Sequence, residues 1–202
     1  LRTVERMEDI VVRVTAENGM VGYGEAPPTA VITGDTRGSV LCAIREHIAP
    51  ALTGMDILAL EEVMERLHHA IKGNTSAKAA VDMALYDLWA KVIGKPLYQL
   101  LGGYRDTIET DLTISVNPVP QMVADSLAAV QDGYRVLKVK VGKEGMADIP
   151  RIAAIREAVG PDIRIRVDAN QGWNVKDSIR IITAMEDKGL DIDLVEQPVA
   201  AG

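Results

Sequence analysis

Short β-prone segments and longer amphipathic segments alternate along the second half of the chain. Strands are predicted at 111–116, 135–141, 163–168 and 191–196, with helices near 119–132, 146–159 and 175–188 between them. Such alternation is typical of a parallel sheet whose strands are joined by crossover helices. The pattern therefore predicts a βα-repeat domain over residues 106–202.

The first half of the chain follows a different pattern. Two β-prone runs within residues 10–25 flank Asn18-Gly19, a dipeptide that fits a two-residue primed turn because both central positions need positive φ. Three amphipathic helical patterns follow, and the third ends near Gly94 and Pro96. A hairpin followed by helices predicts an α+β domain over residues 1–105.

Polar residues occupy one face of the predicted parallel strands. Leu137, Val139 and Val141 share a face, so Lys138 and Lys140 point the opposite way, because side chains alternate with period two. By the same alternation the polar face of the flanking strands carries Asp111, Thr113, Ser115, Arg164, Arg166, Asp168 and Asn170. A sheet covered on both faces has nearly continuous apolar strands, so this polar face favours a (β/α) barrel with its site at the strand C-terminal ends.

Two acidic residues, Asp168 and Glu196, end consecutive strands. Neighbouring carboxylates repel each other unless a cation lies between them. Mg²⁺ is the expected ion, since hard divalent cations prefer oxygen ligands and no Cys or His stands nearby. Lys138 and Lys140 suit acid–base chemistry, because a second ammonium group, a metal ion and a dry site lower a lysine pKa from its ordinary value of about 10.4.

Three other interpretations compete with this site. The Lys-Val-Lys-Val run could be an edge strand that uses lysines to prevent aggregation, and Asp168 could cap the helix that follows Asn174. The pair Gly22 and Gly24 suggests a dinucleotide fingerprint, but its third glycine is missing and two prolines follow. The combination of lysines and carboxylates at successive strand ends favours the metal site.

Charge and cysteine content narrow the function classes. Lys and Arg number 22 against 29 Asp and Glu, a net charge of −7, which gives no support for a nucleic-acid or anionic-membrane partner. The single cysteine, Cys42, cannot form an internal disulfide and is expected to be a small buried side chain. No apolar run approaches the roughly 18 residues of a membrane span. These features favour a cytoplasmic protein with a small-molecule substrate.

Several motifs give the chain a resemblance to a known family. PLYQLLGG, KVKVG, VDANQGW and VEQP occur in that order, and the chain resembles the muconate-lactonizing subgroup of the enolase superfamily. The segments LRTVE, GEAPPTAVITGDT, GNTSAKAAVDMALYDLWA and TDLTISVN are similar to those of dipeptide epimerases of the L-Ala-D/L-Glu type. The resemblance covers almost all 202 residues.

The resemblance implies a Mg²⁺-dependent epimerase that removes and returns the α-proton next to a carboxylate, through a metal-stabilised enediolate. Asp168 and Glu196 would hold Mg²⁺, Lys140 would exchange the proton on one face, and Lys138 would stabilise charge. Substrate-binding positions implied by the resemblance are Arg2, Thr113, Ile32 and Thr33. The alternatives are a muconate-type cycloisomerase, an o-succinylbenzoate synthase of the same superfamily, and a non-catalytic protein that keeps the scaffold.

The resemblance also implies the architecture: an α+β capping domain without its first strand, followed by about the first half of a TIM-type (β/α) barrel. The family places a second lysine base and a third acidic metal ligand on later strands. Residues 106–202 are far fewer than the roughly 250 of a typical eight-unit barrel. We therefore expect the 202 residues to be a portion of a longer polypeptide that would not fold alone into an active monomer. Assembly into a homo-oligomer is a further expectation.

Overall fold

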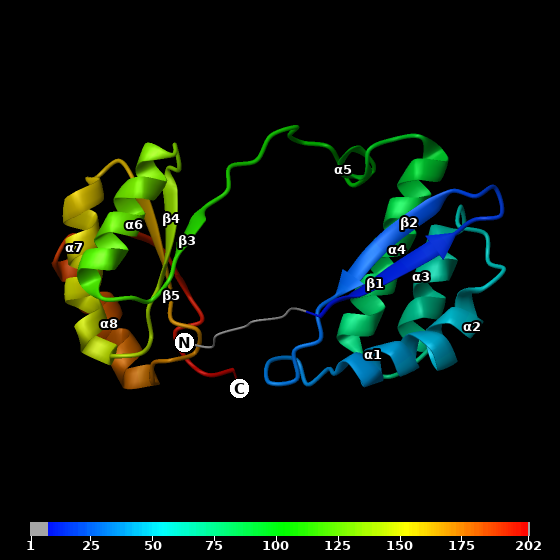
Figure 1. Ribbon diagram of the computed structural model, residues 1–202, viewed down its shortest axis with the longest axis horizontal. Helices are drawn as coiled ribbons and strands as arrows, with labels where there is room; N and C mark the ends of the chain where they lie inside the picture. The colour runs from blue at the N-terminus through cyan, green and yellow to red at the C-terminus, as the bar shows by residue number, and fades with distance from the viewer. Residues whose placement is uncertain (1–7, 202) are drawn as a thin grey trace. The chain divides into compact units, whose positions relative to one another are not determined.

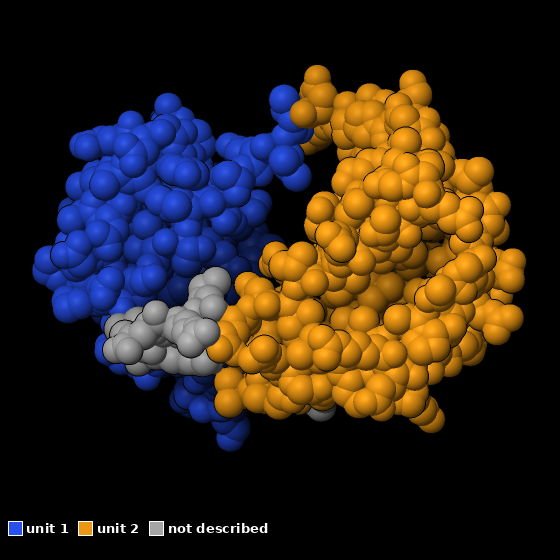
Figure 2. All heavy atoms as spheres, turned by 45° about the vertical axis from the view of Figure 1, so that its right-hand side comes forward, with its two compact units in different colours: residues 1, 107–202 blue, residues 2–106 orange. Residues whose placement is uncertain are grey.

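A computed structural model describes residues 8–201 of the chain. The described residues form two compact units, 8–106 and 107–201, shown in different colours in Figure 2. Within these residues, no helix combines the length and the apolar character that crossing a bilayer requires.

The N-terminal unit opens with the predicted hairpin. Strands β1 (Ile10–Thr15) and β2 (Val21–Ala26) pair antiparallel, which confirms the hairpin. The predicted turn type is wrong. Gly19 has φ of 82° while Asn18 has no positive φ, and the Ala16 amide bonds the Met20 carbonyl. The strands are thus joined by a three-residue loop that ends in a left-handed glycine, a common alternative to the two-residue turn.

Helices make up the rest of this unit. They are α1 (Arg37–Cys42), a π-helical turn η1 (Ala43–Ile48), α2 (Ala49–Leu52), α3 (Leu60–His69), α4 (Thr75–Ile93) and α5 (Leu97–Leu100). The three predicted helical patterns are present, but the first is interrupted by the π turn before Pro50. Proline has no N–H and clashes with the carbonyl four residues earlier, which favours a wider turn there. Cys42 is exposed, so its predicted burial is wrong.

Two glycines explain how the hairpin packs on α4. A Cβ atom at Gly22 would lie 2.0 Å from the Ala84 carbonyl oxygen, and one at Gly24 would lie 1.9 Å from the Ala80 carbonyl oxygen. No side chain fits at these distances, so β2 approaches the helix backbone directly. The Gly22 and Gly24 pair therefore serves strand–helix packing, and the dinucleotide interpretation is wrong.

The C-terminal unit contains four parallel strands in the order β3-β4-β5-β6. The elements are β3 (Leu112–Ile114), α6 (Val119–Gln131), β4 (Val136–Lys140), the 3₁₀ turn η2 (Gly145–Ala147), α7 (Asp148–Val159), β5 (Arg164–Asp168), α8 (Val175–Asp187) and β6 (Ile192–Glu196). Each predicted strand and helix of this half is confirmed to within a few residues. Because β4 lies between β3 and β5, the edge-strand interpretation of its lysines is wrong.

The apolar core of this unit lies on one face of the sheet. Helices α6, α7 and α8 cover that face (Figure 1), and Leu137, Val139, Ile165 and Val167 are fully buried beneath them. Lys138 and Lys140 of β4 project from the opposite face and are only half-buried. The alternation predicted for β4 and β5 is therefore confirmed, and it separates the packed face from the polar one.

Candidate active site at the strand ends

Four charged side chains meet where β4, β5 and β6 end. In the parallel register, Lys140 lies opposite Asp168, and Asp168 lies opposite Glu196. Lys138 lies two residues before Lys140 on β4, so the two side chains are on the same face of the sheet. The strand ends therefore bring the two amines and two carboxylates of the sequence prediction into one cluster.

Short contacts join the members of this cluster. Lys138 Nζ lies 2.5 Å from Glu196 Oε2 and 3.2 Å from Asp168 Oδ2. Lys140 Nζ lies 2.6 Å from the same Asp168 oxygen and donates to Asn170 Oδ1 at 3.0 Å. Asp168 is 1% exposed and its second oxygen accepts the Asn170 backbone N–H at 2.8 Å. Asp168 is thus the buried centre of the cluster.

The contacts perturb two of the charged groups. Burial works to raise the pKa of Asp168, but hydrogen bonds from Lys140, the Asn170 amide and Lys138 outweigh it and lower that pKa below its ordinary value. The hydrogen bond to Glu196, supported by Asp168, raises the pKa of Lys138 above its ordinary value although partial burial opposes the shift. Both shifts favour the charged forms, so the cluster is a set of mutually neutralising ions.

The β6 strand reaches the site through an irregular register. Ile165 lies opposite Ile192, but the next residue, Arg166, lies opposite Leu194, so β6 contains one extra residue. Asp193 Oδ2 contacts Arg166 Nε at 2.9 Å, and Glu196 contacts Lys138. Residues three apart in a regular strand face opposite ways, so this bulge lets both acids reach the polar face.

Two glycines fit the loops after β4 and β5 together. A Cβ atom at Gly142 would lie 2.1 Å from the Ala169 carbonyl oxygen, and one at Gly172 would lie 2.1 Å from the Gly142 carbonyl oxygen. Backbone bonds join the second loop to the segment after β6: the Gln171 amide donates to the Gln197 carbonyl at 2.8 Å. The KVKVG, VDANQGW and VEQP motifs therefore end in three loops that contact one another.

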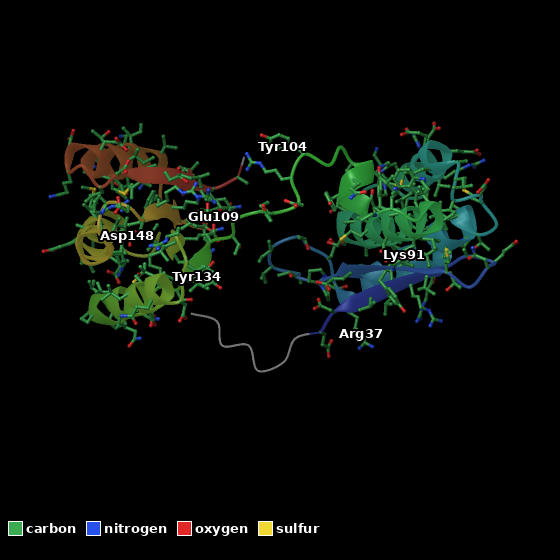
Figure 3. The ribbon with its side chains drawn as sticks, turned by 90° about the horizontal axis from the view of Figure 1, so that it is seen from above. Arg37, Lys91, Tyr104, Glu109, Tyr134 and Asp148 are labelled. Carbon is green, nitrogen blue, oxygen red and sulfur yellow. The ribbon has the colours of Figure 1, made fainter. Side chains whose placement is uncertain are left out.

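A buried carboxylate that the sequence analysis missed lies beneath these loops. Asp148, labelled in Figure 3 at the start of α7, is fully buried and accepts from the Gly142 amide at 2.9 Å and Trp173 Nε1 at 3.0 Å. The helix after Asn174 is capped by Asn174 itself, whose side chain accepts the Asp177 amide, so the helix-cap interpretation of Asp168 is wrong. A charged residue at the first position of a helix gave no signal of this contact.

The remaining predicted site residues are not members of this cluster. Thr113 on β3 pairs with Lys138, next to the cluster on the polar face. Arg2 lies outside the described residues. Ile32 and Thr33 belong to the N-terminal unit, in a loop where Ile32 is 79% exposed. Asp35 ends that loop and accepts the Ser76 hydroxyl at 2.5 Å. Substrate roles for these positions stay predictions.

The donor set fits a magnesium ion. Asp168 and Glu196 supply carboxylate oxygens on adjacent strand ends, while no group of three or more His, Cys, Asp or Glu that could hold a metal occurs within residues 8–201. Mg²⁺ is commonly bound by only one or two carboxylates together with water and substrate oxygens. The Lys138 ammonium contacts both carboxylates, as expected for a position that attracts a cation.

Comparison with known proteins places the chain in a family. The N-terminal domain model of mandelate racemase/muconate lactonizing enzyme matches residues 1–102, and the model described as enolase C-terminal domain-like matches residues 121–202. The chain belongs to this branch of the enolase superfamily. The predicted fold class, an α+β capping domain followed by part of a (β/α) barrel, is confirmed.

Several relatives with high sequence identity are epimerases. The chain is 52% identical over 200 residues to the L-Ala-D/L-Glu epimerase of Bacillus subtilis and 49% identical over 201 residues to that of Clostridium acetobutylicum, covering 98% and 100% of this chain. A substrate-liganded structure of the Bacillus enzyme matches with a TM-score of 0.94 over 99% of this chain and 56% of that one. A dipeptide epimerase from Enterococcus faecalis, complexed with Mg and L-Leu-L-Tyr, is 41% identical with a TM-score of 0.90 over 98% of this chain and 55% of that one.

The match in length is partial. The chain spans 55% and 56% of the two curated relatives named above.

Proposed function

We propose that the protein carrying these residues is a Mg²⁺-dependent epimerase of dipeptides of the L-Ala-D/L-Glu type. The observation that carries the proposal is the cluster in which Lys138 and Lys140 meet Asp168 and Glu196 at adjacent strand ends. The reaction removes the α-proton next to a carboxylate and returns a proton to the opposite face. The epimerases at 52% and 49% identity support this activity over a cycloisomerase or an o-succinylbenzoate synthase.

The residues of the cluster divide into two roles. Asp168 and Glu196 would hold the metal ion, which when bound supplies positive charge that stabilises electron density gathering on the substrate carboxylate. Lys140 accepts the α-proton in its neutral form: the C–H bond breaks, an N–H bond forms, and the electron pair delocalises into the carboxylate. Lys138 donates hydrogen bonds to the developing charge beside it.

The ionic contacts of Lys138 indicate how the cluster responds to a metal ion. Its ammonium group now contacts oxygens of both carboxylates. If Asp168 and Glu196 held a divalent cation, Lys138 would lose these contacts and its ammonium group would be repelled. The contacts with Glu196 and Asp168 that raise the pKa of Lys138 would then be weaker, and the amine would be free to donate to the substrate.

Other positions complete the proposal. Thr113 lines the polar face beside Lys138, Ile32 and Thr33 close over the dipeptide, and Arg2 meets its side-chain carboxylate. The four strands belong to an eight-stranded barrel whose later strands supply the second proton-exchanging lysine. We place the enzyme in the reducing cytoplasm, which its single cysteine supports. Assembly into homo-oligomers is part of the same proposal.

The direct test is proton exchange in heavy water. The full-length protein that carries these residues is incubated with L-Ala-L-Glu and Mg²⁺ in D₂O. NMR follows α-deuteration and polarimetry follows epimerisation. We expect both, and we expect both to stop when Mg²⁺ is chelated. Lys143→Ala is a matched control, because Lys143 is exposed in the loop just after β4. Absence of exchange with L-Ala-L-Glu and with other dipeptides would disprove the proposed activity.

A further inference from the structure

The Asp148 carboxylate joins the two loops that follow the site strands. Its Oδ2 atom accepts the backbone N–H of Gly142, two residues after Lys140. The same oxygen accepts the indole N–H of Trp173, five residues after Asp168. One atom of a helix residue therefore bonds both chain segments that carry the central ion pair.

Arg151 compensates the buried negative charge of Asp148. Its guanidinium donates to Asp148 Oδ1 and contacts Glu144 Oε2 at 3.1 Å. Asp148 is fully buried and Arg151 is 5% exposed, so the pair is withdrawn from water. A buried charge needs such a partner, and removing either member leaves an uncompensated ion. A neutral asparagine could still accept from the loops, but its amide would direct N–H groups at the guanidinium.

The loops leave little freedom for another arrangement. The close approaches at Gly142 and Gly172 stack the two loops against each other. Trp173 is buried at 4% exposure, so its indole is fixed by packing as well as by its hydrogen bond. A displacement of either loop would therefore move the end of the strand that precedes it. Those two strand ends carry Lys140 and Asp168, whose Nζ and Oδ2 atoms are 2.6 Å apart.

We propose that Asp148 is a positioning residue that sets the separation of Lys140 and Asp168 by bonding the loops after both. Its hydrogen-bond partners are Gly142, Trp173 and Arg151, none of which belongs to the cluster of lysines and carboxylates, and its effect passes through Gly142 and Trp173. This inference rests on the proposed function for its kinetic consequence. A misplacement of about 1 Å at reacting groups can reduce a rate about 100-fold. Outer partners of metal ligands typically change metal affinity by about 10- to 100-fold.

The test uses Asp148→Asn and Trp173→Phe, with Trp89→Phe as the matched control in the other unit. We expect both site variants to weaken Mn²⁺ binding, measured by electron paramagnetic resonance, at least about tenfold. We expect kcat for α-proton exchange to fall by a similar factor with KM nearly unchanged. Trp89→Phe should leave all three quantities unaltered.

A spectroscopic measurement separates positioning from a loss of folding. The 202 residues contain two tryptophans, Trp89 and Trp173. When Trp89 and every tryptophan outside these residues are replaced by phenylalanine, the fluorescence reports Trp173 alone. Adding Asp148→Asn should increase acrylamide quenching of Trp173 while circular dichroism shows a folded protein. Rates and affinities are compared at temperatures where each variant is fully folded.

The outcomes are distinguishable. If folded Asp148→Asn and Trp173→Phe bind Mn²⁺ and exchange protons like the unaltered protein, the positioning inference is wrong even though the proposed function stands. If the unaltered protein binds Mn²⁺ but exchanges no dipeptide proton, the proposed activity fails and Mn²⁺ affinity alone decides the inference. If the unaltered protein binds no Mn²⁺, both are overturned.

Discussion

Lys138 and Glu196 contact each other across an intervening strand, with Lys138 Nζ 2.5 Å from Glu196 Oε2. Lys138 belongs to β4 and Glu196 to β6, and β5 lies between them. Both side chains reach over Asp168, whose Oδ2 lies 3.2 Å from the same amine. These contacts thus join the three strand ends electrostatically.

Glu196→Gln tests the pH behaviour of this contact in the metal-free protein. Because the hydrogen bond to Glu196 is the main cause that raises the pKa of Lys138, its folded-state pKa exceeds the unfolded value. That contribution to stability is complete below the unfolded pKa of about 10.4 and is lost as pH rises through the folded pKa. We expect Glu196→Gln to lower the Lys138 pKa in an NMR titration and to reduce the loss of stability in alkali. An unchanged Lys138 titration would contradict this.

Asp168→Asn should weaken the metal site more than any change at an exposed acid. The variant removes the carboxylate of Asp168, which is only 1% exposed and contacts both Lys138 and Lys140. We expect Mg²⁺ affinity, measured by titration calorimetry, to fall by about 100-fold or more, since a ligand is lost rather than an outer partner. Asp162→Asn, at an exposed position before β5, is the control and should bind like the unaltered protein.

Lys140→Ala should abolish α-proton exchange from one epimer of the dipeptide. The reason is geometric: a base on one strand face reaches one face of the α-carbon, and the opposite face needs a different group. Deuterium incorporation starting separately from L-Ala-L-Glu and L-Ala-D-Glu measures the two directions. Equal residual exchange from both epimers would remove Lys140 from its assigned role.

Gly24→Ala should destabilise the N-terminal unit. The new methyl group would lie 1.9 Å from the Ala80 carbonyl oxygen, so β2 would have to move away from α4. Overpacking of this kind costs about 1–3 kcal/mol, and a backbone neighbour places it at the upper end. Gly38→Ala is the control, because its nearest atom is 3.9 Å away and alanine favours the α1 helix. Urea unfolding followed by circular dichroism compares the two, and equal midpoints would contradict the packing argument.

The periodicity of the sequence was sufficient to predict the parallel strands and their polar face. On β4 and β5, the lysines and Asp168 lie where simple alternation puts them. On β6 alternation fails, because Asp193 and Glu196 both reach the polar face through a bulge. A bulge depends on how two strands pair, so the sequence of one strand alone does not predict it.

Other features of the site depend on contacts between distant segments. Asp148 gives no sequence signal, since its partners Gly142 and Trp173 come from two different loops. The turn at Asn18-Gly19 differs from the prediction for a related reason. The dipeptide is compatible with two loop lengths, and pairing of Ala16 with Met20 selects the longer one. Arg2 lies outside the described residues, so its role still depends on the resemblance alone.

The three helices of the C-terminal unit cover only one face of its sheet (Figure 1). Val139 contributes to that packing, while Lys138 and Lys140 on either side of it project from the opposite face. The charged cluster and the packed core are therefore encoded by interleaved but separate positions of the same strand. Such a protein can exchange its functional groups one at a time, and acquire a new reaction, without rebuilding the core that holds it together.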